Sequence, residues 1–417
     1  MRSRAPSSGT VAPDAAAPPL PRVLAGRSPA PETLAFTDWE ALVELALRHD
    51  LAPWLHVRLR PQRAALPPAA ASRLHEAYLA SAAQSLRVLH QLGEILGAFR
   101  AARVAVMPLK GACLAEAVYG DSALRPMADL DVLVKPRDLD RAVSELRALG
   151  YTSGQPFDPA AARAGFQDMP EMSRPAGVPV ELHWTLVSPL RGVNVDAGEL
   201  EGLWSRATPT AIAGVETLML SPADLLLHLC LHMSVHHRFN NISLRNVVDL
   251  AEVCQRYPSE IDWAGLVTRA NAWGGANGVR IALELALEWT DVALPARALA
   301  GLAGDSAGDT TIEWVRRKIV YGSPPALNGE MSRLKAEGGL AARLGAVRNA
   351  LFRPRGVMAR LYPAPADSWR ILAYYPVRWK GLWVRYRGAL WKLVTRNRGF
   401  VEEARKEARL REYLGRR

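Results

Sequence analysis

Cysteine is scarce in this sequence, and its spacing argues against two kinds of site. The chain of 417 residues has three cysteines, Cys113, Cys230 and Cys254, and they form no CxxC pair. An odd number of widely spaced cysteines provides neither a disulfide framework nor the paired thiolates of a zinc site. We expect all three to be small, buried hydrophobic residues.

The sequence also lacks the apolar segments that membrane insertion and secretion require. No uninterrupted apolar run reaches the roughly 18 residues that span a bilayer, and the N-terminus has no apolar core like that of a signal peptide. The expected compartment is the cytoplasm.

Acidic residues are outnumbered by basic residues at one end of the chain only. The net charge is +11, but residues 331–417 hold 21 Lys and Arg against 6 Asp and Glu. Residues 1–330 hold 31 against 35 and are slightly acidic. Any attraction to a polyanion is therefore expected from the C-terminal segment.

The distribution of apolar residues divides the chain into five regions. The first residues are rich in Pro, Ala and Ser and cannot bury enough surface to fold, whereas helical spacing of leucines dominates the stretch up to about residue 100. The predicted regions are a disordered tail (1–32), a helical cap (33–100), a core of strands and helices (101–215), a helical domain (216–300) and a basic, tryptophan-containing helical segment (301–417).

Short apolar runs typical of strands alternate with helical patterns in the core region. Ser221 followed by Pro222 predicts the start of a long helical stretch after it. The predicted strands are 104–109, 129–134 and 178–184, and the predicted helices are 112–119 and 138–149.

The strongest chemical signal is a pair of aspartates, Asp129 and Asp131. Strand geometry puts both on one face while Leu130 points into the core, and a half-buried strand tolerates two such carboxylates most readily with a cation between them. Carboxylate oxygens suit Mg²⁺. Glu181 would complete a three-carboxylate metal site if its strand is adjacent. Alternatively, the two aspartates lie on the solvent-exposed face of an edge strand. Glu181 could likewise be an ordinary carboxylate of a strand that binds no metal.

A turn upstream of these aspartates has the features of a phosphate site. Lys110 and Gly111 end a strand and open a helix, where a glycine permits close approach and the helix N-terminus favours an anion. Lys110 is either a phosphate ligand or a surface charge. Arg125 either grips phosphate with its planar guanidinium or pairs with Asp121.

These segments resemble a known family. The resemblance covers about residues 85–260, and it is most specific between residues 109 and 134. The segments 109–119, 124–134 and 180–183, together with Gly150-Tyr151, are similar to uncharacterised bacterial nucleotidyltransferases of the polymerase-β-type superfamily.

The resemblance implies an α+β fold, with a short mixed sheet, flanking helices, and mainly helical regions before and after it. It implies that the glycine turn holds a triphosphate, that Asp129 and Asp131 bind Mg²⁺, and that Glu181 binds metal or acts as a base. Lys110-Gly111 replaces the usual Gly-Ser or Gly-Gly of the superfamily. The gap from Gly111 to Asp129 is also longer than usual.

Four histidines form a second candidate site. His228, His232 and His236 are spaced by four, which puts them on one helical face, and His237 follows. No HExxH zinc motif is present. The face either binds a metal, lines the cleft, or packs against the next helix, where Arg245 and Asp249 could hydrogen-bond it.

The C-terminal segment interleaves tryptophans with cations between residues 377 and 398. This pattern admits an amphipathic helix at an anionic membrane surface, a site for RNA or another polyanion, or packing on the catalytic domain. Residues 401–417 mix Glu and Arg and predict a solvated helix.

The expected function is Mg²⁺-dependent transfer of a nucleoside monophosphate from a nucleoside triphosphate, with ATP as a candidate donor, to a small-molecule, peptide or protein acceptor. The alternatives are a catalytically silent module that binds nucleotide or a partner, and an RNA-directed nucleotidyltransferase.

Overall fold

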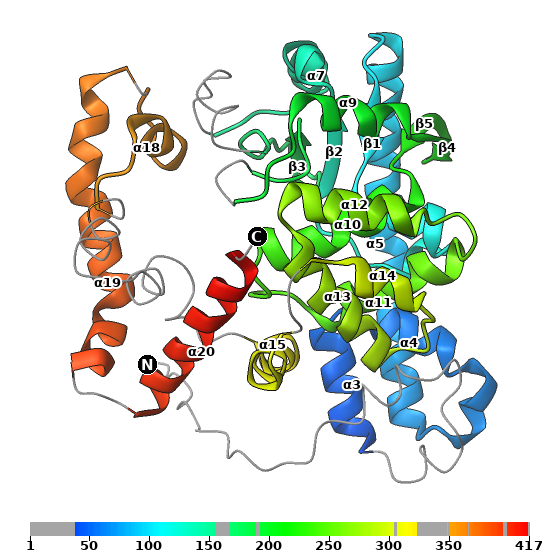
Figure 1. The fold of residues 1–417 in the computed structure, drawn as a ribbon. Helices are drawn as coiled ribbons and strands as arrows, with labels where there is room; N and C mark the ends of the chain where they lie inside the picture. Colours follow the sequence, from blue (N-terminus) through cyan, green and yellow to red (C-terminus); the bar gives the residue numbers. More distant parts are fainter. Residues whose placement is uncertain are drawn as a thin grey trace, which may run out of the picture.

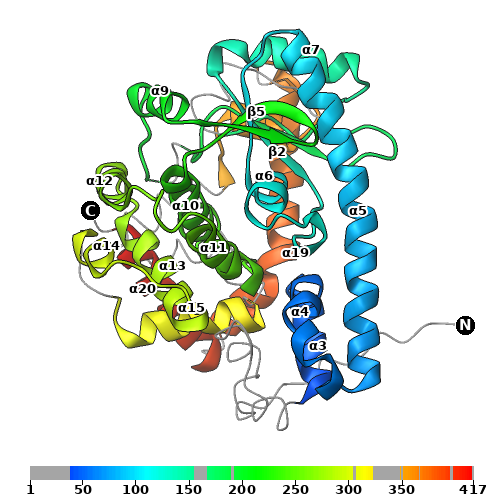
Figure 2. The ribbon, with the colours of Figure 1, turned by 90° about the vertical axis from the view of Figure 1, so that its right-hand side faces the viewer.

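A computed structural model describes residues 38–154, 167–188, 192–303, 307–322, 348, 351–365, 367–394 and 398–415. The predicted tail at residues 1–32 lies outside this part of the chain. Figures 1 and 2 show the fold from two directions, with the sheet at one end and most helices below and beside it.

The N-terminal cap is helical, as its apolar spacing predicts. It contains α3 (Trp39–Arg48), α4 (Ala52–Arg58), the 3₁₀ turn η1 (Arg60–Ala65) and the long helix α5 (Pro68–Ala101). Proline starts α5 because the first helical turn needs no donor at that position. Two leucines of α5, Leu79 and Leu86, are 52% and 70% exposed, and its other leucines are buried.

The sheet is small and mixed, which confirms the predicted α+β fold. It consists of β1 (Val106–Pro108), β2 (Leu130–Val134) and β3 (Val180–His183), in that order. β1 runs antiparallel to β2, and β2 runs parallel to β3. Strand β2 is therefore central, and the alternative of an exposed edge strand is wrong.

Helices cover this sheet and carry its connections. Between β1 and β2 lie α6 (Lys110–Cys113), the π-helical turn η2 (Leu114–Val118) and the 3₁₀ turn η3 (Ser122–Leu124). After β2 come the 3₁₀ turn η4 (Pro136–Asp138) and α7 (Leu139–Ala148). All five residues of β2 are buried, so the strand is not half-buried as predicted, because elements pack on both of its faces.

A β-hairpin that the sequence analysis did not predict follows helix α9 (Ala197–Ser205). Its strands are β4 (Thr208–Ile212) and β5 (Val215–Met219). Ala213 and Gly214 form the two-residue turn, both with positive φ, as tight hairpins require. Thr217 Oγ1 donates to the carbonyl of Val106 on β1 at 2.9 Å, which ties the hairpin to the sheet.

A helical layer follows the hairpin and is confirmed from Pro222 onward. Ser221 caps the first helix by accepting a hydrogen bond from the Asp224 N–H, and Pro222 occupies its first turn. The layer comprises α10 (Pro222–Leu231), the π-helical turn η6 (His232–His236), α11 (Leu244–Arg256), α12 (Trp263–Trp273), α13 (Ala276–Trp289) and α14 (Ala296–Gly301).

One continuous hydrophobic core joins the cap, the sheet and this helical layer. Cys113, Cys230 and Cys254 are buried free thiols, as expected. The boundaries of the five predicted regions remain a proposal, because one hydrophobic core runs through several of them.

The C-terminal part is helical. It contains α15 (Asp309–Tyr321), α18 (Arg355–Leu361), the 3₁₀ turn η8 (Trp369–Ala373), α19 (Tyr374–Val394) and α20 (Arg398–Gly415). In Figure 1, α18 and α19 lie on the far side of α20 from the sheet. No helix of the described residues is long and apolar enough to cross a membrane.

The helix predicted at residues 401–417 is confirmed as α20, but the prediction that it is solvated is wrong for one of its faces. Ala404, Glu407 and Leu410 of α20 are all buried, because they lie on one helical face that packs against α15. Lys318 Nζ of α15 contacts Glu407 Oε2 at 2.8 Å, and both side chains are 1% exposed. Asn277 on α13 donates to the Tyr413 carbonyl at 2.8 Å.

Candidate active site

The centre of the candidate site is a pair of carboxylates on adjacent strands. Asp131 on β2 lies directly opposite Glu181 on β3 in the parallel register. The Asp131 side chain is 3% exposed and the Glu181 side chain 34%. The structure therefore brings these two predicted residues together, one buried and the other accessible.

The Lys110 turn contacts this pair. Lys110 Nζ lies 2.7 Å from Asp131 Oδ1, and the Leu109 N–H donates to the Asp131 carbonyl at 2.9 Å. Lys110 has a φ of 44°, a left-handed conformation that costs free energy in a residue with a Cβ and that clusters at functional sites. A Cβ on Gly111 would lie 3.2 Å from Met127 Cγ, so glycine permits the close approach here.

His183 completes the cluster, and the sequence analysis did not assign it. Its Nε2 donates to Asp131 Oδ1 at 2.9 Å and lies 3.5 Å from Glu181 Oε2. His183 follows Glu181 by two residues on the same strand. The period-two spacing that paired the aspartates was a signal that could have placed His183 on the face of Glu181.

The charges of this cluster stabilise one another. Burial alone would raise the pKa of Asp131, but Lys110 and His183 outweigh it and hold the pKa well below its usual value. Burial would likewise lower the pKa values of Lys110 and His183, but the charge of Asp131 and hydrogen bonds to the carboxylates raise both. The cluster is therefore an ionic network with Asp131 charged.

Asp129 lies at the margin of this network. It is exposed and precedes β2 rather than standing within it. Its pKa is raised, first by partial desolvation and then by repulsion from Asp131. Asp129 is thus electrostatically coupled to the cluster, but it does not share a strand face with Asp131 in the way the sequence predicted.

Arg125 is bound by a residue other than the predicted Asp121. Its Nε donates to Asp249 Oδ1 at 2.8 Å, and both side chains are buried. Asp121 instead accepts a hydrogen bond from Tyr78. Arg125 therefore links the loop before β2 to α11, and direct contact with phosphate stays a prediction.

The four histidines lie beside the cluster, and the predicted bonds from α11 are not the contacts made there. Asp249 pairs with Arg125, and Arg245 donates to Asp50 and to the Pro126 carbonyl. His228 is 2% exposed, and its pKa is lowered to about 3, first by burial and then by Lys110.

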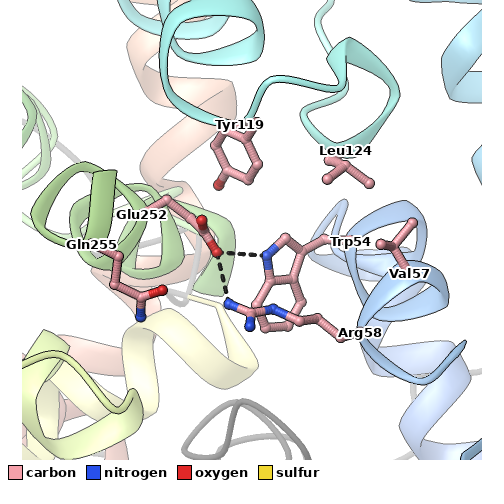
Figure 3. A pocket seen from close by; sticks show the side chains of 7 residues that line it. All are labelled: Trp54, Val57, Arg58, Tyr119, Leu124, Glu252 and Gln255. Carbon is pink, nitrogen blue, oxygen red and sulfur yellow. Dashed lines mark hydrogen bonds and ion pairs between the residues drawn. The ribbon is translucent and has the colours of Figure 1, made fainter. Parts of the chain in front are cut away.

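A separate pocket lies between the cap and α11 (Figure 3). It has a volume of about 260 Å³. Glu252 accepts hydrogen bonds from Trp54 Nε1 at 2.9 Å and Arg58 Nη2 at 3.0 Å across it. None of the carboxylates described above lines this pocket, so it is distinct from the candidate active site.

The cluster fits a divalent cation. Asp131, Glu181 and His183 each offer one ligand atom, and these atoms lie within 4.8 Å of one another. Carboxylate oxygens suit Mg²⁺ and Mn²⁺, and an imidazole is also compatible with Mn²⁺. The Lys110 ammonium contacts Asp131 in the structure.

Comparison with known proteins gives one match. Residues 36–291 match the family described as "Uncharacterised nucleotidyltransferase". The chain belongs to this family. No curated protein and no solved structure matches the chain.

Membership in this nucleotidyltransferase family makes the protein a transferase of phosphorus-containing groups. The matched residues include the cap, all three strands of the mixed sheet and the helices from α10 to α13. Nucleotidyltransferases generally use divalent metals, and the Asp131 cluster lies within the matched segment.

Proposed function

We propose that the protein transfers a nucleoside monophosphate from a nucleoside triphosphate to a small-molecule, peptide or protein acceptor in a Mg²⁺-dependent reaction. One observation carries the proposal: Asp131 and Glu181 face each other across adjacent strands, with Lys110 on Asp131, in a nucleotidyltransferase. Paired carboxylates beside a lysine turn are the groups this chemistry needs.

The metal would be held by Asp131 and Glu181, with His183 and Asp129 beside them. When bound, Mg²⁺ would neutralise charge on the reacting phosphate. We assign Lys110 and Gly111 to the phosphates because the Lys110 ammonium reaches the carboxylates and glycine keeps the turn open.

In the proposed reaction, an acceptor oxygen forms a bond to the α-phosphorus and the bond to the β-phosphate oxygen breaks. Pyrophosphate leaves, and the acceptor proton is lost. Glu181 is the carboxylate suited to accept that proton, because its side chain is 34% exposed whereas that of Asp131 is 3% exposed. Arg125 would act indirectly, because its ion pair with Asp249 anchors the loop that precedes β2.

Thermal unfolding tests this function. Nucleoside triphosphate with Mg²⁺ is expected to raise the Tm, and the combined Asp129→Asn and Asp131→Asn variant should lose the metal-dependent part of the increase. Glu181→Gln is a milder variant, because it removes one charge at a half-exposed site. Asp140→Asn, on the exposed surface of α7, is the matched control. Unchanged metal-dependent stabilisation in the double variant would refute the assignment.

Release of pyrophosphate in a screen of acceptors separates an enzyme from a catalytically silent nucleotide-binding module. An RNA acceptor is the remaining alternative. It requires RNA binding by the full chain that weakens steeply with salt, and the absence of such binding would remove it.

We further propose peripheral contact with an anionic membrane through α19, which contains residues 377–394 of the basic segment predicted at 377–398. Trp383 is 63% exposed and Val384 56% exposed, and the exposed Lys380 and Arg387 lie within one turn of them, as in a helix that lies at an anionic membrane surface. Trp383→Ala with Val384→Ser should reduce cosedimentation with phosphatidylserine vesicles severalfold. Leu86→Ala, at an exposed leucine of the cap, should not. Equal cosedimentation of all three proteins would contradict the contact.

A further inference from the structure

Four histidines form a continuous row at the end of α10. His232 stacks on His236 with ring centroids 5.4 Å apart and planes 9° apart. His237 meets both rings edge-on, and its Nε2 lies 3.2 Å from His232 Nε2. The His228 ring centroid is 6.3 Å from that of His232. We call these four residues the histidine row.

The histidine row ends beside β3. His236 Nδ1 lies 2.9 Å from Gln167 Nε2 and 3.3 Å from Gln167 Oε1, so the Gln167 amide hydrogen-bonds this ring nitrogen in either tautomer. The Gln167 carbonyl accepts from the Trp184 N–H at 3.0 Å, and Trp184 directly follows His183. Gln167 thus joins the histidine row to the end of the strand that carries the candidate metal ligands Glu181 and His183.

At its other end, the histidine row is influenced by the charge of Lys110. The positive charge of Lys110 lowers the pKa values of both His228 and His232, after burial as the larger cause. His228 is 2% exposed, and neither of its ring nitrogens has a hydrogen-bond partner among the described residues. A buried imidazole without a partner is costly, and a ligand at this position would satisfy it.

The backbone of this segment is also unusual. Two members of the histidine row, His232 and His236, lie on the π-helical turn η6, and such turns are frequent at functional sites. Arg238 and Phe239 follow it with φ values of 52° and 56°. Gly278 on α13 packs so closely that an added Cβ would lie 2.5 Å from Ser234 Cβ of η6.

Lys110 interacts with groups of different charge. Its ammonium is attracted to the carboxylates of Asp131 and Glu181, which suit a cation. In the histidine row, the charged groups that act on His232 are Lys110 and the other imidazoles. Because the Lys110 ammonium is already paired with Asp131, it cannot by itself neutralise a polyphosphate, and further donors are needed.

We propose that the histidine row is a polyphosphate-binding surface of the active site, where imidazole N–H groups donate to the β- and γ-phosphates of the triphosphate. The proposal rests on the proposed function. The Lys110-Gly111 turn has no serine that could donate to a phosphate, and the histidine row supplies donors instead. A transition metal is the rival occupant of these histidines. Within the described residues, the side chains whose ligand atoms group closely enough for a metal are Asp131, Glu181 and His183.

Binding of sodium tripolyphosphate to the full chain in EDTA, measured by calorimetry, tests the proposal without metal or catalysis. His232→Phe with His236→Phe keeps the stacked rings but removes their donors. We expect the Kd to rise about tenfold or more, as for lost hydrogen bonds to a charged group. His75→Phe, at a histidine of the cap that contacts His56, is the control and should bind like the wild type.

Circular dichroism establishes whether each variant is folded. If the double variant does not fold, His236→Phe alone decides, with an expected severalfold rise in Kd. Equal binding by wild type and folded variants, or no binding by the wild type, overturns the proposal. So does a loss of Zn²⁺ or Mn²⁺ binding, measured without EDTA, while tripolyphosphate binding persists. Stabilisation by Mg²⁺ and triphosphate that still depends on Asp131 would show that the proposed function stands when this inference fails.

Discussion

His228 illustrates how a single residue can carry a measurable pH dependence. Its pKa is about 3 in the folded protein, lowered first by burial and then by Lys110, whereas an unfolded histidine titrates near 6.5. The unfolded chain therefore takes up this proton before the folded chain does. The stability contributed by neutral His228 is complete above about pH 6.5 and is lost as the pH falls below that value.

His228→Leu is therefore expected to flatten the pH dependence of unfolding. From pH 7.5 to pH 5 the wild type should lose about 2 kcal/mol more stability than the variant, because one proton is bound by the unfolded state only. Urea denaturation at a series of pH values measures the difference. Parallel curves for the two proteins would show that His228 is accessible to protons in the folded state.

Asp131 shows what a local pattern can and cannot fix at the residue scale. Alternation in the strand predicted correctly that Asp131 is part of β2. It could not reveal that Asp129 precedes the strand and is exposed, since that depends on where pairing with β3 begins. Period-two spacing could place His183 on the face of Glu181, but its contact with Asp131 could not be predicted, because that contact depends on the pairing of β2 with β3.

At the scale of elements, the packing of α13 on the π-helical turn positions the histidine row. A methyl group on Gly278 would lie 2.3 Å from Ser234 Oγ and 2.5 Å from its Cβ. Neither atom lies at the end of a long flexible side chain, so the turn or α13 must shift. The glycine thus permits the contact that holds the row in place.

Gly278→Ala is expected to destabilise the protein by about 2 kcal/mol, within the usual range for overpacking. Gly97→Ala in α5 is the matched control. Nothing lies within 4 Å of the added Cβ there, and alanine should stabilise that helix by roughly 0.5–1 kcal/mol. Chemical denaturation of the two variants should therefore give changes of opposite sign, and changes of the same sign would contradict this account of the contact.

The hairpin β4–β5 is an element that sequence patterns did not reveal. Its strands contain Thr, Pro and Glu at exposed positions and only Ile212 and Met219 are buried. Apolar alternation is weak in such a sequence, and the Ala213-Gly214 turn lacks the Asn-Gly or Asp-Gly signature of tight hairpins. The hairpin is held instead by contacts to other elements, including the bond from Thr217 to β1.

At the scale of the whole molecule, a buried ion pair fastens the C-terminal helix to the body of the protein. Lys318 and Glu407 are separated by 89 residues and contact each other at 2.8 Å. Trp314 Nε1 also donates to Glu407 at 3.3 Å. Removing one charge would leave the other buried without its partner, which is strongly destabilising.

Glu407→Gln and Lys318→Met should each reduce stability by about 3–5 kcal/mol. The double variant should lose clearly less than the sum of the two losses, since the two side chains interact directly. A double-mutant cycle in guanidinium chloride provides the measurement. Additive losses would mean that the pair does not couple α15 to α20.

The sequence by itself determined the local features of this protein: the capped start of α10 at Ser221-Pro222, the strands that carry Asp131 and Glu181, and the family. These follow from neighbouring residues, because capping, alternation and turn chemistry act over a few positions. Only the tertiary structure decided that Arg125 pairs with Asp249, that Glu407 of α20 is buried against Lys318, and that the charge of Lys110 acts on His228 and His232. Those outcomes depend on burial and on charge pairing between segments that are far apart in the chain. A local sequence pattern does not show which distant residue will pair with a given buried charge.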